Sequence, residues 1–106
     1  MKMNLAVQIV RYVDNHQPGW VECQFVDAKG RRHAFIDKVP GFTAAHLGPE
    51  SVYPQSAYVS CEVLSTSQDE DGRAMAHITT AHPYDIESTE GLSEFEVYSD
   101  QLSHLP

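Results

Sequence analysis

Apolar and polar residues alternate along most of the chain with the period of two that is typical of half-buried β-strands. The alternation predicts a long first strand, on which Leu5, Val7, Ile9 and Val13 share one face. Further strands are predicted over residues 21–25, 33–37, 57–65, 73–80 and 94–99. No stretch has the apolar spacing of a longer amphipathic helix, so the pattern predicts an all-β fold.

The clearest local signal is the turn sequence Asp27-Ala28-Lys29-Gly30. Asp at the first position and Gly at the fourth suit a type I turn that is followed by a left-handed residue. In the hairpin closed by this turn, the predicted opposite pairs are Phe25 with His33, Cys23 with Phe35, and Val21 with Asp37. A second, acidic hairpin turn is predicted over residues 68–72.

The chain of 106 residues has the length of a single domain, residues 1–106. We expect at most one short helical turn, over residues 44–47, with Thr43 as the N-cap and Gly48 as the stop. An open sheet of about six strands would expose two edges to other chains. The sequence therefore favours a small antiparallel barrel, and a two-sheet sandwich is the alternative.

The charge of the chain is negative and unevenly distributed. Seven Lys and Arg stand against fifteen Asp and Glu, a net charge of −8. Residues 1–38 carry six basic and four acidic residues, whereas residues 39–106 carry one basic residue, Arg73, and eleven acidic ones. Nucleic-acid binding needs a basic surface, and the only basic cluster is Lys29, Arg31 and Arg32 beside the first turn. We expect no nucleic acid and a protein partner with a basic surface.

The apolar segments and the cysteines bear on the compartment. No run of about 18 apolar residues is present, so we expect no membrane-spanning helix. The N-terminal residues make a poor signal peptide because Gln8 and Arg11 interrupt the apolar stretch. Cys23 and Cys61 fall on the apolar faces of their strands and belong to no CxxC motif. We expect two reduced core cysteines in a cytoplasmic protein, although the sequence leaves open whether they pair.

Two longer runs carry a resemblance to known proteins. They extend from Val21 to Gly30 and from His33 to Pro40. The shorter segments 53–54, 71–73 and 86–91 accompany them, followed by Phe95, Val97 and residues 101–102. Together these segments resemble a group of short bacterial proteins of unknown function, and the similarity spans residues 5–102. The resemblance implies a bacterial, cytoplasmic, stand-alone domain, and it implies neither an activity nor any site residues.

The sequence lacks the common signatures of metal and nucleophile chemistry. Its six histidines include no HExxH motif, no pair at helical spacing and no cluster with cysteine. The serines lack the GxSxG elbow, and the glycines match no phosphate-binding loop. We therefore expect no metal and no cofactor, and we assign no catalytic residue.

Residues 82–91, here called the acidic loop, stand apart from the strand and turn pattern. They contain three acids, two hydroxyl residues, a histidine and a tyrosine. One interpretation is an acidic surface with a tyrosine anchor, which receives Arg or Lys from a partner. The other is a solvated connection whose Ser and Thr bond to their own backbone. The predicted partner-binding residues are Tyr84, Asp85, Glu87, Glu90, Glu94 and Glu96.

Three hypotheses about function follow. The first is a non-enzymatic, immunity-like or adaptor protein that docks a basic partner through the acidic surface. The second is a small-ligand binder or enzyme with a pocket at the barrel mouth, and it requires three of six residues to converge. Those six are His33, Asp37, His77, His82, Tyr84 and Asp85. The third is a homodimer that forms through a free sheet edge or through Tyr12, Trp20 and Tyr58 on the outer face.

Overall fold

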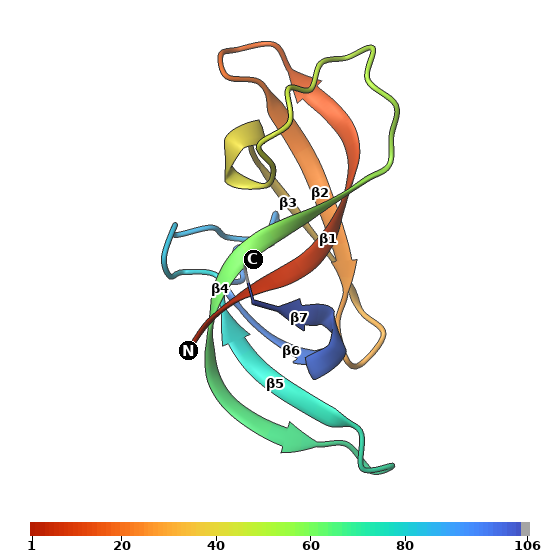
Figure 1. Cartoon of the computed structure of the whole chain (residues 1–106), viewed down its shortest axis with the longest axis vertical. Helices are drawn as coiled ribbons and strands as arrows, with labels where there is room; N and C mark the ends of the chain where they lie inside the picture. Colours follow the sequence, from red (N-terminus) through yellow and green to blue (C-terminus); the bar gives the residue numbers. More distant parts are fainter. Residues whose placement is uncertain (105–106) are drawn as a thin grey trace.

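Within residues 1–104, all strands belong to one antiparallel sheet. The computed structural model describes residues 1–104, and in them the strand order is β3-β2-β1-β4-β5-β6, with β7 paired to β1 (Figure 1). The strands are β1 (Lys2–Asp14), β2 (Trp20–Val26), β3 (Arg32–Lys38), β4 (Gln55–Gln68), β5 (Ala74–Thr79), β6 (Glu94–Tyr98) and β7 (Leu102–Ser103). The all-β prediction is confirmed. The alternative of a sandwich is wrong, because a sandwich needs two sheets and the described strands form one.

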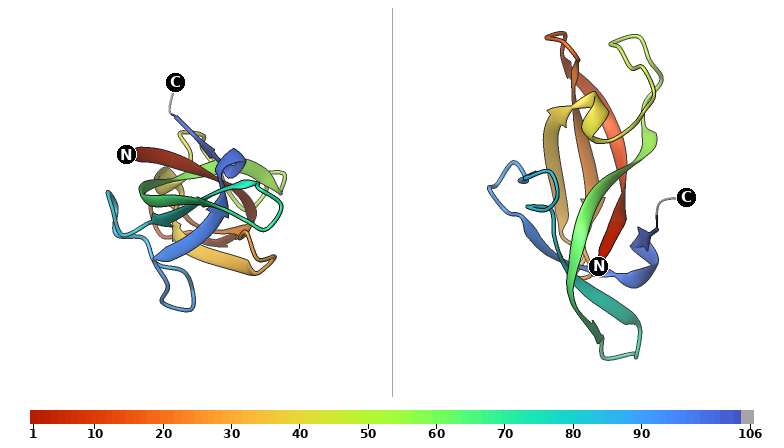
Figure 2. Two further views of the ribbon diagram at one scale, coloured as in Figure 1. Left: turned by 90° about the horizontal axis from the view of Figure 1, so that it is seen from below. Right: turned by 60° about the vertical axis from the view of Figure 1, so that its left-hand side comes forward.

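The sheet curls into a half-barrel, so the two ends of the strand order, β3 and β6, approach each other (Figure 2). Phe95 of β6 packs edge-on against Phe25 of β2 and Phe35 of β3, with ring centroids 5.2 and 5.8 Å apart. The Ala28 N–H donates to the carbonyl of Glu96 at 2.9 Å. Aromatic packing and a few backbone bonds therefore join the two ends of the sheet in place of a full ladder.

The register predicted for the first hairpin is confirmed. Phe25 lies opposite His33, Cys23 opposite Phe35, and Val21 opposite Asp37. The Gly30 N–H donates to the Asp27 carbonyl at 3.0 Å, and Gly30 has a φ of 81°, as the turn requires. Cys23 and Cys61 are free thiols, fully buried in the core. Burial raises the pKa of Cys23 to about 12 and that of Cys61 to about 11.

The outer half of β1 differs from the prediction. A β-bulge between Ile9 and Arg11 reverses the alternation, because an inserted residue moves every later side chain to the opposite face. Val13 is therefore 39% exposed, and Tyr12 packs against the core. The proposed outer aromatic set of Tyr12, Trp20 and Tyr58 does not share one face, because Tyr12 packs against the core, whereas Trp20 and Tyr58 alternate with buried residues of their strands.

The helical turn predicted over residues 44–47 does not form. Two short 3₁₀ turns occur elsewhere, η1 (Val39–Gly41) directly after β3 and η2 (Ser99–Gln101) after β6. Pro40 favours η1 because the first helical turn does not need its missing N–H. The Thr43 hydroxyl instead accepts the N–H of Ala45 two residues on, a local turn that competes with the helix. No helix within residues 1–104 has the length and apolar character needed to cross a membrane.

Candidate functional site

The acidic loop joins β5 to β6, and a buried threonine holds its base. The Thr80 hydroxyl donates to the Ile86 carbonyl at 2.6 Å, and the Ile86 N–H donates to the Thr80 carbonyl at 3.0 Å. The Thr80 N–H also donates to the carbonyl of Ser93 at 2.8 Å. Ile86 is buried in the core, while Tyr84 and Asp85 just before it are exposed. The loop is therefore fixed at Ile86 and presents Tyr84 and Asp85 to solvent.

The second half of the loop is a tight turn built by Ser88. Its hydroxyl oxygen accepts the N–H groups of Glu90 at 3.3 Å and Leu92 at 3.1 Å. The Thr89 N–H donates to the Ala34 carbonyl of β3 at 2.8 Å, which ties the loop to the far end of the sheet. The second interpretation of the loop, a connection whose Ser and Thr side chains bond to the loop backbone, is confirmed for Ser88.

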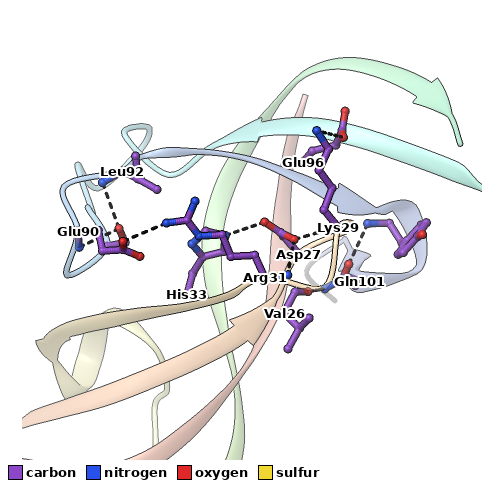
Figure 3. Close-up of polar contacts among 11 residues, drawn as sticks. Val26, Asp27, Lys29, Arg31, His33, Glu90, Leu92, Glu96 and Gln101 are labelled. Carbon is purple, nitrogen blue, oxygen red and sulfur yellow. Dashed lines mark hydrogen bonds and ion pairs between the residues drawn. The ribbon is translucent and has the colours of Figure 1, made fainter.

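Three of the six predicted partner-binding residues are glutamates that lie against an Arg, Lys or His side chain of the chain itself (Figure 3 shows the first two pairs). The pairs are Glu90 with Arg31 at 3.0 Å, Glu96 with Lys29 at 4.0 Å, and Glu94 with His77 at 2.8 Å. Exposed pairs of this kind stabilise a fold by less than about 1 kcal/mol each. The pairs with Arg31 and Lys29 nevertheless reduce the negative charge that Glu90 and Glu96 offer to a partner.

The other three predicted residues lie on the outside of the acidic loop, where the Lys2 ammonium is 5.9 Å from the centroid of the Tyr84 ring. Tyr84 is 60% exposed, and Asp85 and Glu87 are also exposed. Within residues 1–104, no salt bridge joins Asp85 or Glu87 to a basic group. Asp85 has a φ of 53°, in the left-handed region that Asp tolerates better than most residues. Tyr84, Asp85 and Glu87 are hereafter called the open acidic face.

The candidate residues for ligand binding or catalysis are spread over several surroundings. His33 is buried in the core, His77 contacts Glu94 on the outside, and His82 is exposed. Among residues 1–104, no group of three or more His, Cys, Asp or Glu is arranged to hold a metal ion. Of the six candidates, Asp37 and Tyr84 line one cavity together. The structure therefore brings two of the six residues into one cavity.

A buried His–Asp pair was not anticipated from the sequence. His33 Nε2 lies 2.7 Å from Asp27 Oδ2, and the ring packs 5.2 Å from Phe25 and 4.8 Å from Phe95. Burial acts to raise the pKa of Asp27, but hydrogen bonds from His33 and from the backbone N–H groups of Arg31 and Lys29 outweigh it, so the pKa is lowered. The predicted pairing of Phe25 with His33 was the available signal, because it placed the histidine on the core face.

The cavity that Asp37 and Tyr84 share lies between η1, the β1–β2 connection and the acidic loop. It has a volume of about 410 Å³ and is called the Tyr84 cavity. Its lining residues are Pro18, Asp37, Lys38, Pro40, Gly41, Tyr84 and Ile86. A second cavity of about 390 Å³ shares Pro40, Gly41 and Tyr84 with it. The exposed tyrosine of the acidic loop thus borders two adjoining hollows.

Comparison with known proteins adds no relative. No protein-family model matches the chain, and neither a curated protein nor a solved structure matches it. The interpretation of the site therefore depends on its own geometry and charge.

Proposed function

We propose that the protein is a non-enzymatic acidic module that binds a basic region of a partner protein, in the manner of an immunity or adaptor protein. The observation that carries this proposal is the open acidic face. Asp85 and Glu87 have no salt-bridge partner within residues 1–104, and they follow the exposed Tyr84 on a loop that is fixed at Ile86. Complementary charge accelerates and orients association, and tyrosine is a frequent anchor of protein interfaces.

The surroundings of the basic cluster favour a protein partner over nucleic acid. Lys29 and Arg31 each lie near a carboxylate of the C-terminal third, and Arg32 donates to Gln24 at 3.0 Å. Phosphate binding depends on free basic groups that displace counterions. The basic residues of the first hairpin are instead used within the chain, while acidic groups remain exposed.

We place this module in the cytoplasm of a bacterium, without membrane attachment. Free, buried cysteines are typical of proteins in reducing compartments. The resemblance of residues 5–102 to short bacterial proteins is the support for a bacterial source.

The test is capture of partners from a bacterial lysate at about 0.05 M salt, followed by calorimetry on the purified pair up to about 0.5 M salt. We expect a basic partner whose affinity falls as salt screens the charges. The double variant Asp85→Asn/Glu87→Gln should weaken binding by about tenfold or more, because it removes two unpaired charges from the interface.

The matched control is Glu70→Gln/Asp71→Asn, which removes the same two charges from the exposed turn between β4 and β5. It should change the affinity much less if the contact is local. Binding that ignores salt, or that responds equally to both double variants, would contradict the proposal.

A further inference from the structure

The Tyr84 cavity combines apolar walls with one half-buried carboxylate. Pro18, Pro40 and Ile86 provide the apolar surface, and Tyr84 supplies an aromatic ring. Asp37 lies at the end of β3, where its Oδ1 accepts the N–H of Lys38 at 2.7 Å. No salt bridge joins Asp37 to a basic group within residues 1–104. A partly desolvated carboxylate without a cation attracts one more strongly than a fully exposed carboxylate does.

The basic groups nearest the cavity leave Asp37 free for an external cation. Lys38 lines the cavity, but its ammonium lies 5.8 Å from the ring centroid of Trp20. Lys2 places its ammonium 5.9 Å from the ring centroid of Tyr84. The Tyr84 ring therefore lies where a cation can interact with its negative face, and an incoming guanidinium competes with the Lys2 ammonium for this ring.

We infer that the Tyr84 cavity receives an arginine side chain of the basic partner, with its guanidinium paired to Asp37 and stacked on Tyr84. This inference rests on the proposed function and names the chemical group that the module recognises. Arginine fits better than lysine because its planar guanidinium stacks on aromatic rings and is more weakly hydrated than an ammonium. The methylene stem packs on apolar surface such as that of Pro18, Pro40 and Ile86.

The direct probe is the amide of N-acetyl-arginine, titrated into the ¹⁵N-labelled protein and followed by NMR. We expect saturable shifts of the backbone amides around residues 37–41 and 84–86, with an affinity in the millimolar range that is ordinary for one side chain. The matching citrulline amide has nearly the same shape without the charge, and it should bind at least about tenfold more weakly than the arginine amide. Equal binding of the citrulline amide would overturn the ion pair, and equal binding of the lysine amide would overturn the assignment to arginine.

Two variants test the assigned residues. Asp37→Asn keeps the hydrogen bond to the Lys38 N–H and removes the charge, so it should weaken the arginine probe by about tenfold, whereas Glu70→Gln should leave it unchanged. Tyr84→Phe should bind the probe like the wild type, and Tyr84→Ala should bind it more weakly, because the ring provides the stacking surface. The amide spectrum of each variant shows directly whether it is folded.

The protein partner separates this inference from the function on which it rests. If Asp85→Asn/Glu87→Gln weakens the partner and Asp37→Asn does not, the arginine site is wrong and the acidic module stands. If neither variant weakens the partner, the proposed function fails as well. If both do, the partner should also lose affinity when the arginine at its interface is replaced by lysine.

Discussion

The two hairpin turns of the protein have the same design in different surroundings. The first runs from Asp27 to Arg31 and the second from Asp69 to Arg73, and both have the pattern Asp-x-x-Gly-Arg. In each, Oδ1 of the aspartate accepts two backbone N–H groups, two and four residues later, all at 2.9 Å. In each, the arginine pairs with a carboxylate of the C-terminal third, Glu90 or Asp100. The sequence pattern alone therefore builds the turn.

The second carboxylate oxygen is where the turns differ. Asp27 Oδ2 contacts the buried ring of His33 at 2.7 Å, whereas Asp69 Oδ2 accepts the hydroxyl of Tyr98 at 3.2 Å near the surface. The first turn is also tied to the end of the sheet, because the side chain of Gln101 donates to the Val26 carbonyl at 2.8 Å (Figure 3). One turn helps to close the half-barrel, and the other ends an exposed hairpin.

This comparison shows that local sequence sets the shape of a turn and that its surroundings set its contribution to stability. Because the two turns share their backbone bonds, the second serves as an internal reference for the first. Any difference between matched variants then reports on the burial of the His33 pair and on the backbone bond from Ala28 to Glu96.

The largest difference is expected between Asp27→Ala and Asp69→Ala. Asp27→Ala removes two backbone hydrogen bonds and leaves the buried ring of His33 without its partner. We expect it to lower the free energy of unfolding by about 3 kcal/mol, as loss of a buried polar partner usually does. Asp69→Ala removes the same backbone bonds and a surface contact, so its effect should be clearly smaller. Urea denaturation followed by fluorescence measures both, and equal losses would show that burial adds nothing.

How much was predictable from sequence follows from the same distinction between local and long-range causes. The turn at Asp27–Gly30 and the pairing of Cys23 with Phe35 were predictable because they depend on adjacent residues and on a period of two. The bulge after Ile9 was not predicted, because Arg11 interrupts the apolar face there, but one polar residue in a strand does not by itself indicate an inserted residue. The sequence also predicted a helical turn after Thr43, whereas the 3₁₀ turn forms before it at Pro40, and the Thr43 hydroxyl accepts the N–H of Ala45 instead.

The site divides in the same way. Composition identified the acidic loop and its exposed Tyr84, because three acids and a tyrosine in ten residues fit neither strand nor turn. It could not show that Glu90 and Glu96 would meet Arg31 and Lys29, which requires the curl of the whole sheet. For the same reason, the cavity shared by Asp37 and Tyr84 was visible only in three dimensions.

A double-mutant cycle sharpens the comparison of the two aspartates. The first cycle combines Asp27→Ala with His33→Phe, and the second combines Asp69→Ala with Tyr98→Phe. We expect a coupling energy of about 2 kcal/mol for the buried pair, within the usual range for residues in direct contact. The surface pair should couple more weakly because water competes for both groups. A larger coupling for Asp69 and Tyr98 would reverse the assignment of the two turns.

The pH dependence distinguishes the carboxylates from neutral replacements. The N–H of Arg73 is the largest cause that lowers the pKa of Asp69, and the pKa of Asp27 is also lowered, although burial opposes it. A carboxyl with a lowered pKa stabilises the fold above its unfolded pKa of about 3.9, and this contribution is lost as the pH falls through the folded pKa. Asp27→Asn and Asp69→Asn should therefore be less stable than wild type at pH 6 and approach it at pH 2.5. A gap that stays constant over this range would contradict the lowered pKa values.

The smallest expected difference concerns the two turn glycines. Gly30 and Gly72 have φ values of 81° and 82°, and no atom lies within 4 Å of a Cβ built at either position. Alanine at either position is destabilising only because it must adopt the left-handed backbone conformation, which lowers the free energy of unfolding by about 1 kcal/mol. Gly30→Ala and Gly72→Ala should therefore destabilise the protein equally, as measured by the midpoints of urea denaturation. A larger loss for Gly30→Ala would mean that the contacts of the first turn to β6 also depend on its backbone geometry, so that shape and surroundings are not separable there.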